Sequence, residues 1–258
     1  MLLAIDSGNT NTVFAVFDGE ERRGQWRAST NPSRTADEYA VWLTQLMGLT
    51  GLTRADIHAT IIANVVPATA YALKTLCERY FGAPPMIVGD EGVDLGIGVL
   101  VPNPGEVGAD RLVNAVAANR RYPGKDKIVV DFGTATTFDV VDSRGNYAGG
   151  VIAPGVNLSL EALYMAAAKL PGINIRRPPT VIGTSTVPAM QSGVYWGYVG
   201  LIEGLVERMR RELGRPAFVI ATGGLAALFA DATRVIDQVD PDLTIYGLLD
   251  IYERNKRA

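Results

Sequence analysis

The feature that most constrains the fold is an internal repeat, visible when residues 2–19 are compared with residues 128–145. The first segment reads LLAIDSGNTNTVFAVFDG and the second reads IVVDFGTATTFDVVDSRG. At an offset of 125 residues the matched pairs are Asp6 with Asp131, Gly8 with Gly133, Thr12 with Thr137 and Val16 with Val141. Two similar openings half a chain apart predict two related domains.

Each copy of the repeat has the pattern of a strand, a tight loop and a second strand. An apolar run leads into Asp-x-Gly with small polar residues, and a second apolar run ends at a turn signal. A third strand is expected in each half, at residues 24–28 and 147–152.

Helices and strands alternate after each predicted hairpin. In the first half, Thr35 and Glu38 form a capping-box pattern before a helix that ends at Gly48. A strand at 59–64, a helix at 67–80 and a strand at 86–88 are expected to follow. The second half predicts helices at 156–168 and 188–213, a strand at 217–221 and a helix from Leu225.

A helix at 107–122 is expected to cross from one half to the other, which places the boundary near residue 120. The predicted domains are 1–119, with the first loop, and 120–258, with the second. The fold class is α/β, with a mixed β-sheet and flanking helices in each domain. The irregular stretches 82–105 and 171–183 are expected to be loops over a cleft.

The composition restricts the chemistry. The 258 residues include one histidine, His58, and one cysteine, Cys77, so a Ser/His/Asp triad would depend on His58 and a His/Cys zinc site lacks ligands. Both residues are interpreted as structural, with Cys77 in a core and His58 in a core or on the surface. Carboxylates, hydroxyls, backbone amides and bound ions are left to do the chemistry.

The charge balance and the hydropathy pattern predict where the protein works. A net charge of -3 lacks the basic excess of a nucleic-acid binder, so no nucleic-acid partner is expected. The first apolar run is ended by Asp6, too early for a signal peptide, and no apolar run is long enough to cross a bilayer. We therefore expect a cytoplasmic protein with no membrane partner.

The two Asp-x-Gly loops are suited to phosphate binding. Glycine and hydroxyl residues offer backbone N–H groups and side-chain donors without bulk. Asp6, at the end of the first predicted strand, would suit Mg²⁺, usually through water. A single copy is more simply a β-turn with glycine at positive φ, but two copies in register favour a nucleotide site. Neither loop matches a Walker A or a dinucleotide-binding motif.

This layout resembles the ATPase fold shared by actin, sugar kinases, acetate kinase and the large chaperone ATPases. Four motifs, in order over essentially the whole chain, resemble type III pantothenate kinases more specifically. They are DSGNTN at 6–11, GADR at 108–111, DFGTATT at 131–137, and IGTST at 182–186 followed by MQSG at 190–193. The resemblance implies duplicated actin-like (ribonuclease H-like) domains with a nucleotide cleft between them.

The resemblance also implies an activity and its residues. The activity is ATP-dependent phosphorylation of pantothenate to 4′-phosphopantothenate, the first step of coenzyme A biosynthesis. The implied ATP contacts are Asp6, Ser7, Gly8, Asn9, Thr10, Asn11, Thr12, Val13 and Thr134. The implied substrate contacts are Gly108, Ala109, Asp110, Arg111 and Thr186. Asp110 matches the general base, and Asp131 matches the ligand of a monovalent cation, K⁺ or NH₄⁺.

One position departs from the family pattern. Where the family often has a tyrosine near the substrate, shortly before the GADR motif, this chain has Val101. The departure concerns one pantothenate contact and not the phosphoryl transfer.

Each implied role has a simpler alternative in the sequence. Asp110 could stabilise the first turn of a helix, and Arg111 could form a surface salt bridge. Asp131 could be a second Mg²⁺ ligand, and Thr186 could be the N-cap of the long helix. A glycine pair, residues 223 and 224, could pass an adenosine or simply make a strand-to-helix turn.

Two other functions stay open. One is a kinase or phosphatase of the same fold acting on another small acceptor, and the other is a non-catalytic regulator derived from the kinase. The apolar face of the long helix is expected to be core and would also suit a homodimer interface; its residues are Val194, Tyr195, Tyr198, Leu201, Ile202 and Leu205.

Overall fold

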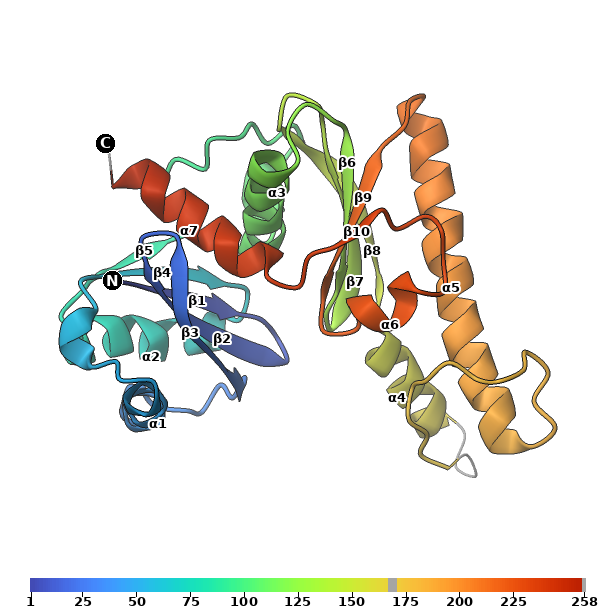
Figure 1. The fold of residues 1–258 in the computed structure, drawn as a ribbon, viewed down its shortest axis with the longest axis horizontal. Coiled ribbons are helices and arrows are strands. Elements are labelled where there is room, and N and C mark those ends of the chain that lie inside the picture. The colour runs from blue at the N-terminus through green and yellow to red at the C-terminus, as the bar shows by residue number, and fades with distance from the viewer. Residues whose placement is uncertain (167–170, 257–258) are drawn as a thin grey trace. The chain divides into compact units, whose positions relative to one another are not determined.

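The chain is built on two five-stranded sheets with the same strand order (Figure 1). The computed structural model describes residues 1–166 and 171–256. The first sheet has the order β3-β2-β1-β4-β5 and the second β10-β9-β6-β7-β8, so that β1 to β5 correspond to β6 to β10. In each sheet the first strand pairs antiparallel with the second and parallel with the fourth. The repeat in the sequence is therefore a repeat of topology.

The strands of the two sheets have the following bounds. The first sheet contains β1 (Leu2–Ser7), β2 (Asn11–Asp18), β3 (Glu21–Ser29), β4 (Ala59–Asn64) and β5 (Pro85–Ile87). The second contains β6 (Lys127–Phe132), β7 (Ala135–Val141), β8 (Tyr147–Pro154), β9 (Phe218–Gly223) and β10 (Gln238–Val239).

The helices follow the strands in both halves. They are α1 (Ala36–Leu49), α2 (Ala70–Thr75), α3 (Ala109–Arg121), α4 (Val156–Ala166), α5 (Thr186–Leu213), α6 (Ala226–Ala230) and α7 (Leu243–Asn255). The predicted helix 67–80 is instead a 3₁₀ turn Pro67–Thr69, then α2, then a π-helical turn Leu76–Tyr80. Residues 167 and 168 of the predicted helix 156–168 lie outside the described residues.

The contacts divide the chain into two compact units. The first unit contains Met1–Tyr122, Gly145–Tyr147 and Asp242–Ala258, and the second contains Pro123–Arg144 and Ala148–Pro241. The sequence placed one boundary between residues 119 and 120. The structure puts the whole of α3 in the first unit, so α3 does not cross between halves, and it adds the C-terminal segment to that unit.

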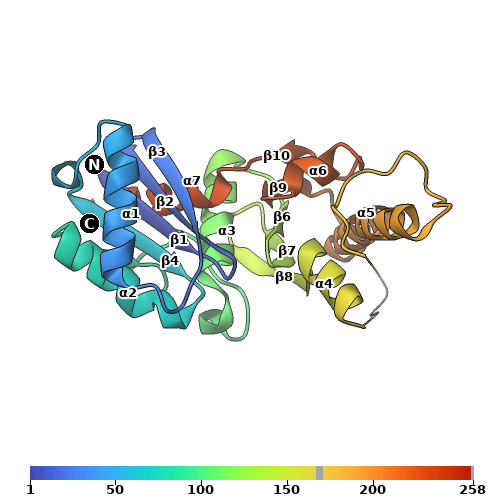
Figure 2. The ribbon, with the colours of Figure 1, turned by 90° about the horizontal axis from the view of Figure 1, so that it is seen from below.

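The sheet of the first unit has helices on both faces (Figures 1 and 2). Alternate β1 residues point to opposite faces, so Leu3 packs in one cluster with Tyr39 of α1 and Leu73 of α2. Leu2 packs in another cluster with Val113 of α3 and Leu248 of α7. The capping box predicted for α1 is confirmed, since the Glu38 N–H donates to Thr35 Oγ1 at 3.3 Å and the Thr35 N–H donates to Glu38 Oε2 at 2.7 Å.

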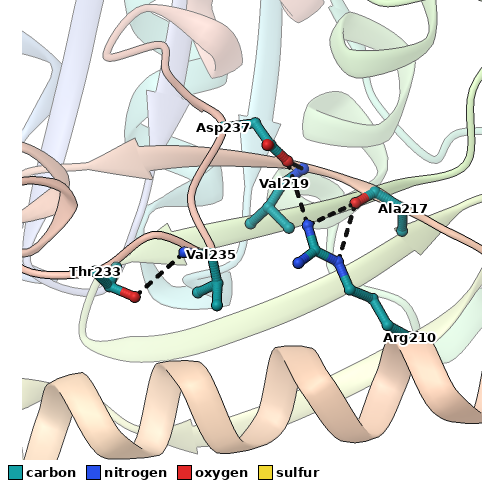
Figure 3. A network of polar contacts seen from close by, with 6 residues as sticks. All are labelled: Arg210, Ala217, Val219, Thr233, Val235 and Asp237. Atoms are coloured by element: carbon teal, nitrogen blue, oxygen red, sulfur yellow. Dashed lines mark hydrogen bonds and ion pairs between the residues drawn. The ribbon is translucent and has the colours of Figure 1, made fainter.

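In the second unit, the long helix α5 runs along the sheet (Figure 1). Its predicted apolar face is confirmed as core, because Tyr195, Tyr198 and Ile202 are buried together with strand residues such as Val130. Arg210 holds the end of α5 near the starts of β9 and β10, since it donates to the carbonyl oxygen of Ala217 at 2.9 Å and pairs with Asp237 at 3.3 Å (Figure 3). Asp237 also accepts the N–H of Val219 at 2.8 Å.

The strand registers correct the sequence alignment of the repeat after the loop. Ser7 faces Thr12 in the first hairpin, and Phe132 faces Thr136 in the second. The second loop is one residue shorter, so the offset is 125 before the loop and 124 after it. Thr12 therefore corresponds to Thr136, and both side chains are completely buried. Matching Thr12 with Thr137 was wrong.

Candidate active site

The first Asp-x-Gly loop, which is predicted to bind phosphate, joins β1 to β2 and exposes its tip. Asn9 and Thr10 are exposed at that tip. The Gly8 N–H donates to the carbonyl oxygen of Asn11 at 3.0 Å, which closes the turn. Gly8 is not at positive φ, so the backbone conformation does not require glycine. A Cβ at Gly8 would lie 3.3 Å from the Asn11 carbonyl oxygen, which makes the site tight but not closed to alanine.

Hydroxyl groups fix this loop from two sides. Thr30, just after β3, donates its N–H to the carbonyl oxygen of Thr10 at 3.0 Å and its hydroxyl to that of Gly8 at 2.6 Å. Thr12 Oγ1 lies 3.0 Å from Thr30 Oγ1, and Ser7 Oγ lies 3.1 Å from Thr69 Oγ1. The other members of the predicted ATP segment are Asp6, half-buried near the end of β1, and the first β2 residues Asn11 and Val13.

The predicted substrate segment lies beside the strand that neighbours this loop. Gly108 precedes the first residue of α3, Ala109, and a Cβ on Gly108 would lie 3.6 Å from Val65 Cγ1. Val65 follows β4 and donates its N–H to the carbonyl oxygen of Ser7 at 3.1 Å. The GADR motif and the first phosphate loop are thus joined through one residue of the same unit.

Asp110 stands in the first turn of α3. Its Oδ1 accepts the N–H of Arg111 at 2.8 Å, and the same oxygen lies 2.6 Å from the position of a Gly108 Cβ. Glycine at position 108 therefore leaves the room that the carboxylate occupies. A helix N-terminus also favours a carboxylate electrostatically, so the helix-stabilising role is compatible with the predicted role as a base.

The second loop joins β6 to β7 and repeats the backbone bonds of the first. The Gly133 N–H donates to the carbonyl oxygen of Ala135 at 3.1 Å, and the N–H of Gly155, just after β8, donates to that of Thr134 at 3.0 Å. Thr134 is exposed, as an ATP contact would need to be. Gly133 is not at positive φ either, so the expectation of a turn glycine at positive φ is wrong in both copies.

Asp131 lies against Gly223, a pairing that the sequence did not reveal. The two strands β6 and β9 are parallel, with Asp131 facing Thr222 and Phe132 facing Gly223. Gly223 has φ +89°, and a Cβ there would lie 2.5 Å from Asp131 Oδ1 and 2.7 Å from the carbonyl oxygen of Phe132. The backbone nitrogen of Phe132 lies at the same 2.7 Å, so Gly223 is packed closely against Asp131 and Phe132 and no side chain fits there. The spacing gave no signal for this pairing, because it depends on the register of β9.

A buried tyrosine supports the second loop from α5. Thr136 Oγ1 lies 2.6 Å from the hydroxyl of Tyr198, which also donates to the carbonyl oxygen of Pro154 at 2.7 Å. Burial raises the pKa of Tyr198, and the bond to Thr136 opposes that rise. The tyrosine stays neutral at physiological pH, and its hydroxyl links Thr136 of β7 to the end of β8.

Thr186 is the first residue of α5 and is exposed. The N-cap position belongs to Ser185, so the simpler role considered for Thr186 is wrong. Thr186 belongs to the second unit, and the segment Gly108, Ala109, Asp110 and Arg111 belongs to the first.

The described residues contain no cluster of side chains that could bind a metal ion by themselves. Among the described residues, no three histidine, cysteine or acidic side chains group closely enough to hold an ion. Mg²⁺ commonly uses one or two carboxylates, water and substrate phosphates, so a lone Asp6 fits that ion. Near Gly223, Asp131 Oδ1 and the Phe132 carbonyl oxygen are donors of the kind that K⁺ takes, although the Phe132 nitrogen lies equally close.

A hollow at the opposite edge of the second sheet is not this site. It has a volume of about 480 Å³ and lies at the starts of β6 and β9, lined by Lys125 and Phe218 among others. Its arginines are already paired, Arg210 with Asp237 and Arg215 with Asp126. The loop between β6 and β7 lies at the other ends of these strands.

The two rare residues are structural, as predicted. Cys77 is completely buried, and burial raises the pKa of its thiol to about 12. His58 is exposed and precedes β4. Of the helices in the described part of the chain, none has both the length and the apolar character needed to cross a bilayer.

Comparisons with known proteins agree with these motifs. The family model for type III pantothenate kinase matches residues 2–208. A type III pantothenate kinase from Paramagnetospirillum magneticum is 67% identical over 255 residues, covering 99% of this chain and 98% of that protein. One from Rhodospirillum rubrum is 68% identical over 256 residues, covering 99% of both.

A solved structure shows the same fold at low identity. A Campylobacter jejuni protein named for the Baf family of transcriptional activators superposes with a TM-score of 0.63, 18% identity, and coverage of 99% of this chain and 100% of that one. Two mixed sheets of one topology, each with flanking helices, confirm the predicted class of duplicated actin-like domains. From its motifs, its family match over residues 2–208 and its close relatives, the chain belongs to the type III pantothenate kinase family.

Proposed function

We propose that this protein transfers the γ-phosphoryl group of ATP to pantothenate, giving 4′-phosphopantothenate in the first step of coenzyme A biosynthesis. The observation that carries the proposal is the junction of the GADR segment with the first phosphate loop through Val65. This junction holds a carboxylate and a hydroxyl-rich loop in one unit. Family membership supplies the substrate.

ATP is bound by the first loop and by Thr134. The exposed tip of the first loop and the exposed Thr134 offer N–H and hydroxyl donors to phosphate oxygens. Asp6 would hold Mg²⁺ through water, and the ion would neutralise charge on the transferring phosphoryl group. Asp131 would hold K⁺ or NH₄⁺, with Gly223 packed closely against it.

Asp110 is the proton acceptor in the proposed reaction. The primary hydroxyl oxygen of pantothenate attacks the γ-phosphorus, the bond to the β-phosphate oxygen breaks, and the hydroxyl proton passes to the Asp110 carboxylate. Placement at a helix N-terminus favours the negative charge of that carboxylate. The reaction needs neither histidine nor cysteine.

The carboxylate of pantothenate pairs with Arg111 in this proposal. A guanidinium offers a planar set of donors to a carboxylate, and Arg111 follows the base directly on α3. Thr186 is a further substrate contact. Val101 contributes an apolar side chain where the family often has a tyrosine.

We also propose that two copies associate through the second unit and that the enzyme works in the cytoplasm. Large apolar side chains on α4 and before α5 are exposed, and burying them would favour association. They include Leu158 (45% exposed), Met165 (77%), Val181 (63%) and Ile182 (82%). On the apolar face of α5, Tyr195, Tyr198 and Ile202 are covered within the second unit, whereas Val194, Leu201 and Leu205 are only partly buried.

The test is ADP release with ATP, Mg²⁺ and K⁺, with and without pantothenate. We expect pantothenate-dependent turnover that falls when K⁺ is replaced by Na⁺. Turnover with another small acceptor instead would favour a different kinase of this fold, and no turnover with any acceptor would favour a regulator.

Asp110→Asn tests the base. We expect a loss of about 10²–10⁴ in kcat, with the melting temperature nearly unchanged. The matched control is Glu106→Gln, which alters an exposed carboxylate four residues earlier that contacts Asn103, and its kcat should stay normal. Near-normal turnover in Asp110→Asn would refute the role.

A further inference from the structure

The turn before β8 contacts both elements that carry the candidate substrate residues of the first unit. Gly145 and Asn146 of the turn and Tyr147, the first residue of β8, are grouped with that unit, although β7 and the rest of β8 are not. On one side they meet α3, and on the other the segment of residues 98–100. No motif in the sequence assigned a role to these three residues.

The contacts with α3 follow one side of the helix. The Arg111 guanidinium lies over the Tyr147 ring, with 5.6 Å between Cζ and the ring centroid. Gly145, at φ +92°, lies so close to Asn119 that any Cβ would overlap that side chain. Arg111 and Asn119 are eight residues apart, about two turns, and so share one side of α3.

The contacts with residues 98–100 are backbone hydrogen bonds. The Tyr147 N–H donates to the carbonyl oxygen of Gly98, and the Leu100 N–H donates to that of Tyr147, both at 2.8 Å. Asn146 Oδ1 accepts the N–H of Gly98 at 3.0 Å. Val101 is the next residue in the chain, so the same turn fixes the start of the segment that carries it.

Burial makes the Tyr147 ring a fixed platform. Only 1% of Tyr147 is exposed, whereas Arg111 is half-buried. A guanidinium held over an aromatic face within about 6 Å is attracted to the ring and loses rotamer freedom. An arginine restrained in this way loses less entropy when it binds a carboxylate.

We propose that Tyr147 is a positioning residue for substrate recognition, which holds the Arg111 guanidinium ready for the carboxylate of the acceptor. The inference rests on the proposed function, because it assumes that Arg111 receives that carboxylate. It adds a residue outside the recognised motifs and assigns it to binding of the acid group rather than to phosphoryl transfer. Tyr147 acts through Arg111 and does not itself touch the substrate.

The chain offers a matched control on the same helix. Arg121, in the last turn of α3, lies over the ring of Tyr246 with 4.4 Å between Cζ and the centroid. Removing either ring deletes an arginine–tyrosine contact from α3, but only the Tyr147 contact adjoins the GADR segment. Tyr147→Leu and Tyr246→Leu therefore separate substrate positioning from helix stability.

The experiment measures kcat and the KM values for pantothenate and ATP. For Tyr147→Leu we expect the pantothenate KM to rise about threefold to thirtyfold, with kcat and the ATP KM within twofold of wild type. Tyr147→Phe keeps a ring and should stay within about twofold throughout, and Tyr246→Leu should leave the pantothenate KM unchanged. Adding Tyr147→Leu to Arg111→Met should cause no further rise, because the two residues act as one unit.

Two further arms guard against a folding defect and against confusion with the proposed function. Tyr147→pentafluorophenylalanine keeps the ring size but reverses the charge of its face, so it should raise the pantothenate KM even if Tyr147→Leu fails to fold. Equal kinetics in Tyr147→Leu and Tyr246→Leu, or a pantothenate KM that pentafluorophenylalanine leaves unchanged, would overturn the inference alone. A wild-type protein without pantothenate-dependent ADP release would overturn the proposed function and the inference together.

Discussion

The two Asp-x-Gly loops make the same backbone hydrogen bonds, but the residue that follows the third strand of each sheet holds its loop in a different way. Thr30 and Gly155 occupy equivalent positions, and each donates its N–H to the carbonyl oxygen of the loop threonine, Thr10 or Thr134. In the first loop the Thr30 hydroxyl adds bonds to Gly8 and Thr12. In the second loop, no side chain fits, because a Cβ on Gly155 would overlap the Thr134 carbonyl.

This difference teaches that a duplicated loop can keep its geometry while its support changes. One loop is held by an added polar group, and the other by the close approach that glycine allows. The first support is a sum of hydrogen bonds, each worth about 1 kcal/mol. The second is a steric condition, which fails altogether when it is broken.

The largest effect is therefore expected from Gly155→Ala. The new methyl group must push Thr134 or the turn aside, which we expect to cost about 2–3 kcal/mol and to raise the ATP KM at least tenfold. Thr30→Ala at the equivalent position should cost about 1 kcal/mol and change the ATP KM only a few-fold. Thermal unfolding and ATP titration measure both. A larger loss of stability or a larger rise in the ATP KM in Thr30→Ala than in Gly155→Ala would contradict this difference between the loops.

The next effect concerns the equivalent positions Gly223 and Asn64, which end β9 and β4. Gly223→Ala places a methyl group against Asp131 and the Phe132 backbone at positive φ, with a cost of about 2–3 kcal/mol, and should raise the K⁺ concentration needed for activity. Asn64→Ala loses the side-chain bond to the Val66 N–H, with a cost of about 1 kcal/mol, and should leave the K⁺ requirement unchanged. A normal K⁺ requirement in Gly223→Ala would contradict the cation site.

A smaller effect is expected from the buried threonines. Thr136→Val removes the partner of Tyr198, and Thr12→Val removes one partner of Thr30. Each should cost about 1 kcal/mol, because valine keeps the shape and loses the hydroxyl. The pKa of Tyr198 should rise further in Thr136→Val, since the bond to Thr136 lowers it, and a spectrophotometric titration above pH 10 would record the change. An unchanged titration would mean that the bond does not form in solution.

The smallest effect on stability is expected from Gly8→Ala and Gly133→Ala. Each Cβ would lie 3.3 Å from a carbonyl oxygen, of Asn11 or Ala135, so both variants should unfold within about 0.5 kcal/mol of wild type. Both should nevertheless raise the ATP KM, because a methyl group then stands on a loop that binds phosphate. Unequal losses of stability would show that the two loops are not equivalent at this position.

Much of this fold could be predicted from the sequence, because apolar runs and Asp-x-Gly loops are local signals. The strand Ala59–Asn64 and the Thr35 capping box lie where the pattern placed them. The register after the second loop could not be predicted, since a one-residue difference in loop length changes the residue pattern of the two hairpins very little. Two contacts could not be predicted because each depends on how distant segments pack. They are the contact of Asp131 with Gly223 and that of Arg111 with Tyr147.

Helix α7 was missed for a physical reason. Gly247 interrupts its apolar pattern, and glycine lowers helix propensity by about 1 kcal/mol relative to alanine. The structure shows why a glycine is needed there. Any Cβ would overlap the carbonyl oxygen of Val113, so the residue that weakens the helix signal is the one that lets α7 pack closely on α3.

The position of α7 sets the order in which the chain can finish folding during synthesis. The residues of the second unit leave the ribosome before α7, which completes the core shared by Val113, Leu248 and the inner face of β1. Part of one apolar face of the first sheet therefore stays uncovered until α7 has been made. A chain that stops after residue 241 would contain the whole second unit, but its first unit would lack α7 and would expose apolar surface to chaperones and proteases.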